Sequence, residues 1–296
     1  MTQYLLDSGD PEEYKAIANL AREHNEVLFG ATTNPSLIAK KLAGKKVSAQ
    51  EAFELQKQIV MEIIDIVPGP VSAEVYADGK TTGEEMAQQG REIAKWHERI
   101  VVKLPTTLEG FKARTLLRRE KIPINNTLVF SQQQVFAVNL HERLIQNNEN
   151  LWPPFISPFV GRLDDMSEDG MVVVEHAMRL KRTYNFTPLV LLSSVRRKEH
   201  MKRGVDCEAD LVTAPATVYE EWFSLAQEQK NAIDTKAYAA SLKSIDYWDP
   251  PAELLAIDSI DWFNQAIATG KLNIQHDLTD KGLVRFAEDW KTIIAS

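Results

Sequence analysis

The feature that most restricts the fold of this sequence is an alternation of short apolar runs with longer amphipathic segments. Runs rich in valine, isoleucine and leucine predict strands at 4–7, 27–32, 71–75, 100–104, 122–130, 155–160, 188–193 and 209–213. None alternates cleanly between apolar and polar residues, which is typical of parallel strands covered on both faces. Helical patterns separate them at 11–24, 49–66, 82–97, 108–120, 131–146, 167–183 and 197–203. A helix after nearly every strand predicts a (β/α)8 TIM barrel of the α/β class.

The chain has 296 residues and no linker rich in proline, glycine and serine, so we expect one domain over 1–296. The stretch 218–277 breaks the rhythm with helical and turn-like pieces that carry several aromatic residues. We interpret it as an atypical insertion, an extra helical elaboration in the C-terminal part of the chain. An amphipathic pattern over 280–294 then predicts a closing helix.

Charge and apolar patterning exclude several classes of function. The 42 acidic and 34 basic residues give a net charge of −8, which disfavours nucleic acid as a partner because phosphate backbones require a basic face. No apolar run is long enough for a membrane helix, and the first residues contain no signal segment. The single cysteine, Cys207, cannot form an internal disulfide. We therefore expect a soluble, cytoplasmic protein without a membrane partner.

Metal and cofactor chemistry have no signature in this sequence. The six histidines lack the spacing of metal ligands, and no glycine-rich phosphate loop is present. We therefore expect neither a metal nor a cofactor.

Polar residues gather at the ends of the predicted strands. In a barrel the carboxyl ends of the strands form the catalytic mouth. The residues found there are Asp7, Thr32, Thr33, Asn34, Glu74, Lys103, Asn125, Thr127, Ser157, Ser194, Arg196 and Thr213. This convergence predicts a functional site at the mouth.

Lys103 follows three apolar residues, an environment in which a lysine amine can act as a nucleophile and form a Schiff base. The alternative is a lysine whose ammonium only reaches the solvent at the barrel rim. Asp7 and Glu74 are candidates for the proton transfers that Schiff-base chemistry requires. Alternatively, Asp7 caps the following helix and Glu74 is an ion-pair partner of Lys103.

Arg162 and Arg196 are candidates for a phosphate clamp, because guanidinium groups bind phosphate oxygens through two hydrogen bonds. Ser194 could add a hydroxyl donor. The alternative is a set of surface salt bridges, for example between Arg162 and the nearby Asp164 or Asp165.

These residues lie in motifs that resemble, in the same order, those of the transaldolase family. The motifs are LLDSGD at 5–10, TTNPSLI at 32–38, SAEV at 72–75, VVKLP at 101–105, NNTLVFS at 125–131, SPFVGRLDD at 157–165, SSVR at 193–196, ADLVT at 209–213 and LTDKG at 278–282. Glu74 and Phe159 make the sequence more similar to transaldolases than to the related fructose 6-phosphate aldolases, which typically carry glutamine and tyrosine at these places.

The resemblance implies a class I enzyme in which Lys103 forms a Schiff base with a ketose phosphate, fructose 6-phosphate or sedoheptulose 7-phosphate. A dihydroxyacetone unit would then pass to an aldose phosphate, as in the pentose phosphate pathway. By the same resemblance Asp7 is the acid and base for carbon–carbon cleavage, and Glu74 acts through a water oriented by Thr127. The implied substrate-binding residues are Thr32, Asn34, Asn125, Ser157, Phe159, Arg162, Ser194 and Arg196.

Two other functions stay open at this point. One is an aldolase that releases free dihydroxyacetone, and the other is a non-catalytic homologue that binds sugar phosphates. Sugar phosphates are the expected partners in every case, and a homo-oligomer is compatible with the resemblance.

Overall fold

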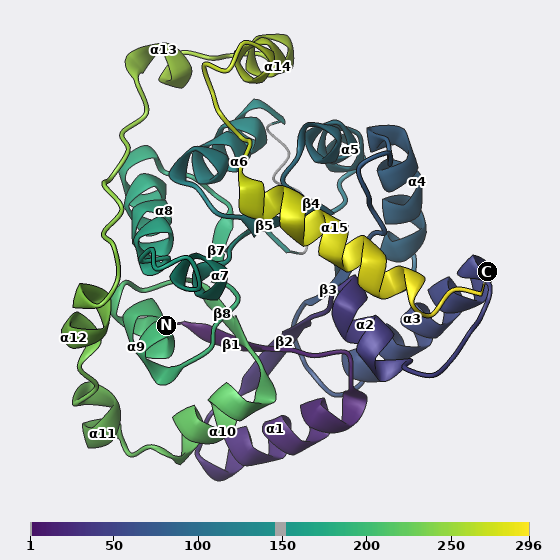
Figure 1. Ribbon diagram of the computed structural model, residues 1–296, viewed down its shortest axis with the longest axis vertical. Coiled ribbons are helices and arrows are strands. Elements are labelled where there is room, and N and C mark those ends of the chain that lie inside the picture. The colour runs from purple at the N-terminus through teal and green to yellow at the C-terminus, as the bar shows by residue number, and fades with distance from the viewer. Residues whose placement is uncertain (1, 146–151, 296) are drawn as a thin grey trace.

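A closed barrel of eight parallel strands forms the centre of the computed structural model, which describes residues 2–145 and 152–295 (Figure 1). The strands are β1 (Gln3–Asp7), β2 (Leu28–Thr32), β3 (Val71–Glu74), β4 (Ile100–Pro105), β5 (Ile124–Val129), β6 (Phe155–Pro158), β7 (Leu189–Leu192) and β8 (Leu211–Ala214). Each pairs with the next along the chain, and β8 pairs with β1 to close the barrel. The predicted (β/α)8 fold is confirmed.

Helices surround the barrel and alternate with its strands. They are α1 (Pro11–Glu23), α3 (Ala49–Ile64), α4 (Gly83–Ala94), α5 (Leu108–Arg119), α6 (Gln132–Ile145), α8 (Met171–Tyr184), α9 (Lys198–Asp206) and α10 (Ala216–Ser224). Side-chain caps fix several starts: the Thr82 hydroxyl accepts a hydrogen bond from the Glu85 amide of α4. The predicted last residue of the helix 131–146 lies outside the described residues. No helix of the described ranges is long and apolar enough to cross a membrane.

Two short helices at the mouth of the barrel are absent from the sequence-based prediction. α2 (Pro35–Lys41) follows β2, and α7 (Val160–Asp164) follows β6. The predicted strand 155–160 therefore ends two residues early, because Phe159 is the residue that precedes α7. Asn34 caps α2, since its side-chain oxygen accepts a hydrogen bond from the Leu37 amide.

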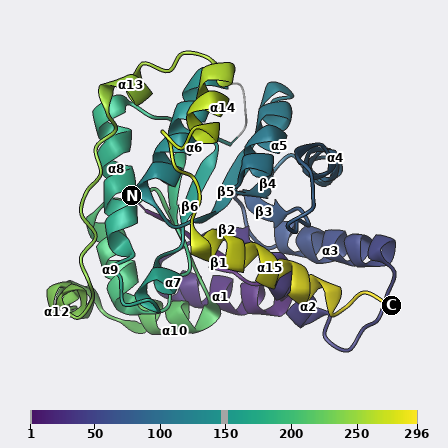
Figure 2. The same ribbon diagram turned by 45° about the horizontal axis from the view of Figure 1, so that its top comes forward.

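The predicted elaboration runs along the outside of the barrel. It contains α11 (Gln227–Asn231), α12 (Thr235–Ala240), α13 (Ala252–Leu255) and α14 (Ile260–Ala268), joined by extended segments. Figure 1 shows this part of the chain passing outside α9 and α8, and α14 then contacts α6. The closing helix α15 (Asp277–Lys291) begins three residues before the predicted start, and it crosses the mouth of the barrel to pack against α2 (Figures 1 and 2).

The interior of the barrel has two levels of different chemistry. A separate cluster of buried apolar side chains fills its lower part, formed by Leu5, Val101, Phe155, Leu191 and Leu211. Two residues further along the same strands lie Asp7, Lys103, Ser157, Ser193 and Thr213. Because side chains alternate along a strand, this second set points to the same side as the first, one level nearer the mouth. The polar side chains therefore lie one level nearer the mouth than a layer of buried apolar side chains.

Candidate active site

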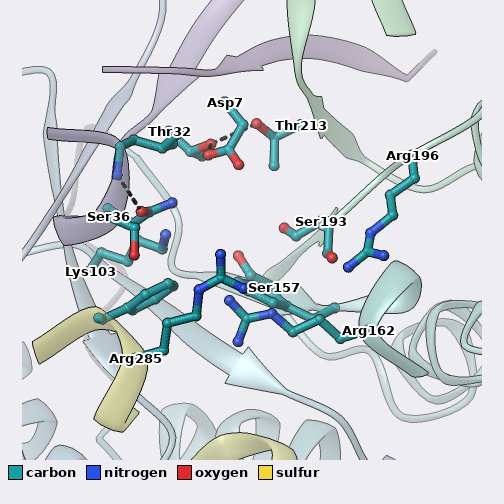
Figure 3. A pocket seen from close by; sticks show the side chains of 15 residues that line it. Asp7, Thr32, Ser36, Lys103, Ser157, Arg162, Ser193, Arg196, Thr213 and Arg285 are labelled. Atoms are coloured by element: carbon teal, nitrogen blue, oxygen red, sulfur yellow. Dashed lines mark hydrogen bonds between the residues drawn. The ribbon is translucent and has the colours of Figure 1, made fainter. Parts of the chain in front are cut away.

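A cavity of about 210 Å³ opens at the carboxyl ends of the strands (Figure 3). Nine of the predicted site residues line it: Asp7, Thr32, Asn34, Lys103, Ser157, Phe159, Arg162, Ser194 and Arg196. The other three, Glu74, Asn125 and Thr127, are buried beside it. The strand-end residues of distant sequence segments therefore meet at one place.

Lys103 is almost completely buried and faces two acceptors. Its Nζ atom lies 3.0 Å from Glu74 Oε2 and donates a hydrogen bond of 3.1 Å to the Thr33 carbonyl. Only 4% of the Lys103 side chain and 3% of the Glu74 side chain are exposed. Lys103 thus lines the cavity without reaching the solvent at the rim, and Glu74 is its ion-pair partner.

Two carboxyl groups of the site have raised pKa values. Desolvation by the surrounding protein raises the pKa of Asp7 and of Glu74, and the nearby Lys103 ammonium opposes both shifts. Asp7 Oδ1 also accepts a hydrogen bond of 2.7 Å from Thr32 Oγ1. The helix α1 is capped by Asp10 instead of Asp7, which leaves the Asp7 carboxyl directed at the cavity.

Two buried oxygen atoms near Lys103 have no hydrogen-bond partner among the described residues. They are Glu74 Oε2, whose contact with Lys103 lacks hydrogen-bond alignment, and Thr127 Oγ1. Asn125 lies beside Lys103 in the strand register and Thr127 lies one level nearer the mouth on the same strand. Unpartnered polar atoms are rare in protein interiors, because a buried polar group without a hydrogen bond costs about 1–3 kcal/mol.

The two predicted asparagines already bind protein groups. Asn125 accepts a hydrogen bond of 2.6 Å from Ser157 Oγ and donates one of 3.0 Å to Ser72 Oγ. The side-chain oxygen of Asn34 caps α2, while its residue lines the cavity. These bonds fix the orientation of both amides.

The predicted clamp arginines have different partners. Arg196 forms an ion pair with Asp165. Arg162 has no carboxylate partner among the described residues, and its guanidinium carbon lies 5.2 Å and 5.3 Å from the ring centres of Phe159 and Phe286. Desolvation lowers the pKa of Arg162, and the neighbouring Arg285 lowers it further. The alternative of a salt bridge between Arg162 and Asp164 or Asp165 does not describe this structure.

A hydrogen-bonded relay joins the Arg196 loop to the elaboration. The Arg196 amide donates to His200 Nδ1 at 3.3 Å, and His200 Nε2 lies 2.6 Å from Asp164 Oδ2. The hydroxyl of Tyr238, on α12, also donates to Asp164. Nε2 of His200 also lies 3.2 Å from the Tyr238 hydroxyl, so these contacts hold α7, the loop after β7 and α12 together.

Strand-end reasoning missed several residues of the cavity. Ser36 lies in the TTNPSLI motif four residues after a predicted strand, and Ser193 is the last residue of another predicted strand. Their positions next to predicted site residues could have indicated them. Arg285 and Phe286 come from α15. The amphipathic pattern of that segment indicates packing alone, and no local signal points to the mouth of the barrel.

The part of the chain that the structure describes contains no group of three histidine, cysteine, aspartate or glutamate residues that could hold a metal ion. The chemistry available in the cavity is that of one amine, two carboxyl groups, hydroxyls and three guanidinium groups.

Comparison with known proteins agrees with this arrangement of residues. The family model described as Transaldolase/Fructose-6-phosphate aldolase matches residues 4–296. A protein of Prosthecochloris aestuarii named probable transaldolase is 37% identical over 219 residues, which are 74% of this chain and 89% of the relative. A protein of the same name from Lactiplantibacillus plantarum is 36% identical over 245 residues, 81% of this chain and 100% of the relative. The chain therefore belongs to the transaldolase/fructose-6-phosphate aldolase family.

Proposed function

We propose that this protein is a transaldolase that moves a dihydroxyacetone unit from a ketose phosphate to an aldose phosphate through a Schiff base on Lys103. The observation that carries the proposal is the position of the Lys103 amine. It lines the cavity, is shielded from bulk water, and has Glu74 at 3.0 Å and Asp7 in the same cavity wall. A buried lysine beside carboxyl groups that can accept its proton can attack a carbonyl as the neutral amine.

The first half of the reaction makes the Schiff base. The Lys103 amine adds to the C2 carbonyl of the ketose, and the resulting carbinolamine loses its hydroxyl as water to leave an iminium ion. A water held between Glu74 and Thr127 would satisfy the two unpartnered oxygens and carry the protons of this step. We assign Glu74 and Thr127 to this role.

The second half breaks and remakes a carbon–carbon bond. Asp7 takes the proton of the C4 hydroxyl, the C3–C4 bond breaks, and an aldose phosphate leaves. The electron pair of the broken bond stays with the three-carbon unit on Lys103, which becomes an enamine. The enamine then attacks the aldehyde of the acceptor, and Asp7 returns its proton to the new alkoxide. The raised pKa of the Asp7 carboxyl suits it to both directions of this transfer.

The guanidinium groups of the cavity serve the phosphate of the substrate. Arg162 forms no salt bridge among the described residues, and Ser194 lines the same cavity. The backbone of Ser194 has a φ of 57°, a conformation that is rare without glycine and that clusters at functional sites. Asn34, Asn125, Thr32 and Ser157 would hold the hydroxyls of the bound sugar.

We further propose that the enzyme acts in the cytoplasm, in the pentose phosphate pathway, with the whole chain as one domain. The exchange of ketose and aldose phosphates supports the pathway. The single cysteine, whose pKa burial raises to about 11, supports a reducing compartment.

The decisive experiment is to reduce the intermediate. The protein is incubated with fructose 6-phosphate and borohydride, and the adduct is located by intact mass and peptide mapping. We expect one dihydroxyacetone-derived adduct on Lys103 and none in Lys103→Met. Turnover is then measured with and without an aldose phosphate such as erythrose 4-phosphate.

A dependence of turnover on the acceptor supports a transaldolase. Release of free dihydroxyacetone without an acceptor would indicate an aldolase instead. Binding of the sugar phosphate without any adduct would overturn the proposal in favour of a non-catalytic binding protein.

A further inference from the structure

The helix α15 brings a third arginine to the cavity. Arg285 lines it together with Arg162 and Arg196, and Figure 3 shows the three side chains directed toward the same space. Arg162 follows β6 and Arg196 follows β7, whereas Arg285 comes from a helix more than sixty residues after the last strand of the barrel. The family motifs quoted above do not include it.

Firm contacts hold α15 at the mouth. Thr279 Oγ1 donates a hydrogen bond of 2.9 Å to the Leu128 carbonyl and accepts one of 2.9 Å from Gln134 Nε2. At the other end of the helix the Ser36 hydroxyl donates to Asp289. The position of Arg285 is therefore set by bonds to β5, α6 and α2.

Counting the charges at the cavity shows an excess of cations. Arg196 has Asp165 as its partner. The only acidic contact of Arg285 in the described chain is a long one, 3.7 Å to Asp289 within the same helix, and Arg162 has none. The cavity is thus lined by Lys103 and three guanidinium groups but by one carboxylate, Asp7, whose charge, with that of Glu74, acts on Arg162 without forming a salt bridge among the described residues. Such an arrangement is unfavourable until an anion occupies the space between the guanidinium groups.

We infer that Arg285 is a phosphate ligand of the bound sugar phosphate and that it determines the preference for phosphorylated over unphosphorylated sugars. This inference rests on the proposed function and adds a substrate-recognition residue to it. Arg162 is the inner cation of this pair, held against Phe159 and Phe286. Arg285 is the outer one, with 70% of its side chain exposed. Arg196 can join them only by loosening its ion pair with Asp165.

The exposure of Arg285 sets the size of its contribution. An exposed charge is screened by salt, so its effect on binding should be up to about fivefold at low ionic strength and smaller at high salt. The reacting carbons lie at Lys103, not at the rim, so the effect should appear in KM and leave kcat nearly unchanged.

The test compares Arg285→Ala and Arg285→Lys with Lys281→Ala, a variant of an exposed lysine on the same helix that does not line the cavity. KM and kcat are measured with fructose 6-phosphate and with fructose. For Arg285→Ala we expect KM for fructose 6-phosphate to rise up to about fivefold at low ionic strength, with kcat/KM for fructose unchanged. Arg285→Lys should retain part of the affinity, and Lys281→Ala should behave as the unmodified protein.

Calorimetric binding of inorganic phosphate separates this inference from the proposed function. The inference is wrong, even where the Lys103 adduct forms, if phosphate binds equally well to Arg285→Ala and to Lys281→Ala. It is also wrong if Arg285→Ala lowers kcat/KM equally for fructose 6-phosphate and for fructose. If phosphate binding depends on Arg285 but no adduct forms, the assignment of Arg285 as a phosphate ligand stands and the proposed function fails.

Discussion

Replacing Gly282 by alanine tests whether activity requires the close contact between α15 and the Arg162 guanidinium. A methyl group at this position would lie 2.7 Å from Arg162 Nη1 and 2.6 Å from Leu128 Cδ2. Ordinary contacts need about 3.5–4.0 Å, so the Arg162 guanidinium has to retreat by about 1 Å. Charge-assisted hydrogen bonds do not survive such a displacement.

The expected effects on stability and on activity differ in size. Alanine stabilises a helix interior by about 0.5–1 kcal/mol relative to glycine, and overpacking costs about 1–3 kcal/mol, so the free energy of unfolding should fall by no more than about 2.5 kcal/mol. Loss of charge-assisted hydrogen bonds to the phosphate costs about 1.5–3 kcal/mol, which corresponds to a decrease of about 10- to 150-fold in kcat/KM for fructose 6-phosphate.

The assay needs a matched glycine elsewhere. Gly90 in α4 is suitable, because a methyl group there would lie 2.6 Å from Leu117 Cδ1, and neither residue lines the cavity. Gly90→Ala should show a similar change in stability with full activity, and Gly282→Ala should keep its kcat/KM for unphosphorylated fructose. Full activity of Gly282→Ala toward fructose 6-phosphate, or an equal loss with both sugars, would refute the reasoning.

Three further substitutions probe the site and its support. Asp7→Asn should abolish carbon–carbon cleavage yet raise the free energy of unfolding at pH 7. The pKa of Asp7 in the folded protein is raised above its ordinary 3.8, so the wild-type protein loses stability as the pH rises from 3.8 through the folded-state pKa and the carboxyl ionises. In urea unfolding this gain should vanish below pH 3.8, and a loss at pH 7 would contradict it. Glu142→Gln removes the carboxylate that pairs with the fully buried Arg114, and it should lower the free energy of unfolding in urea by about 3–5 kcal/mol. A decrease below about 1 kcal/mol would argue against strong coupling between the two side chains. Tyr238→Phe breaks the bond to Asp164 and should raise KM for fructose 6-phosphate about 2- to 30-fold with kcat unchanged; unaltered KM would show that the relay does not position Arg196.

The barrel could be predicted from the sequence because its strands and helices carry local patterns. The buried strands are rich in apolar residues, and helices such as α4 begin at a capping threonine, Thr82. The two short helices at the mouth show no apolar periodicity, although Asn34 caps the start of α2. α2 has seven residues and α7 has five, which is too few for an apolar periodicity to become visible.

The candidate site was predictable to the extent that strand ends converge in a barrel. That rule placed Asp7 and Lys103 together although they are 96 positions apart in the sequence. It could not place Arg285, because the packing of α15 across the mouth depends on contacts with distant segments such as Leu128. Nor could it show that Arg196 pairs with Asp165 while Arg162 forms no salt bridge among the described residues.

The two levels inside the barrel divide the consequences of mutation between abundance and specificity. A change among Leu5, Val101 and Phe155 removes packing and lowers the amount of folded protein without altering which sugar is recognised. A change among the polar residues above them alters the chemistry, and where it removes a buried charge it can even make the protein more stable. Selection thus acts on mutations in the lower level through the amount of folded protein. Mutations in the upper level can change the substrate of the protein while the apolar layer beneath stays intact.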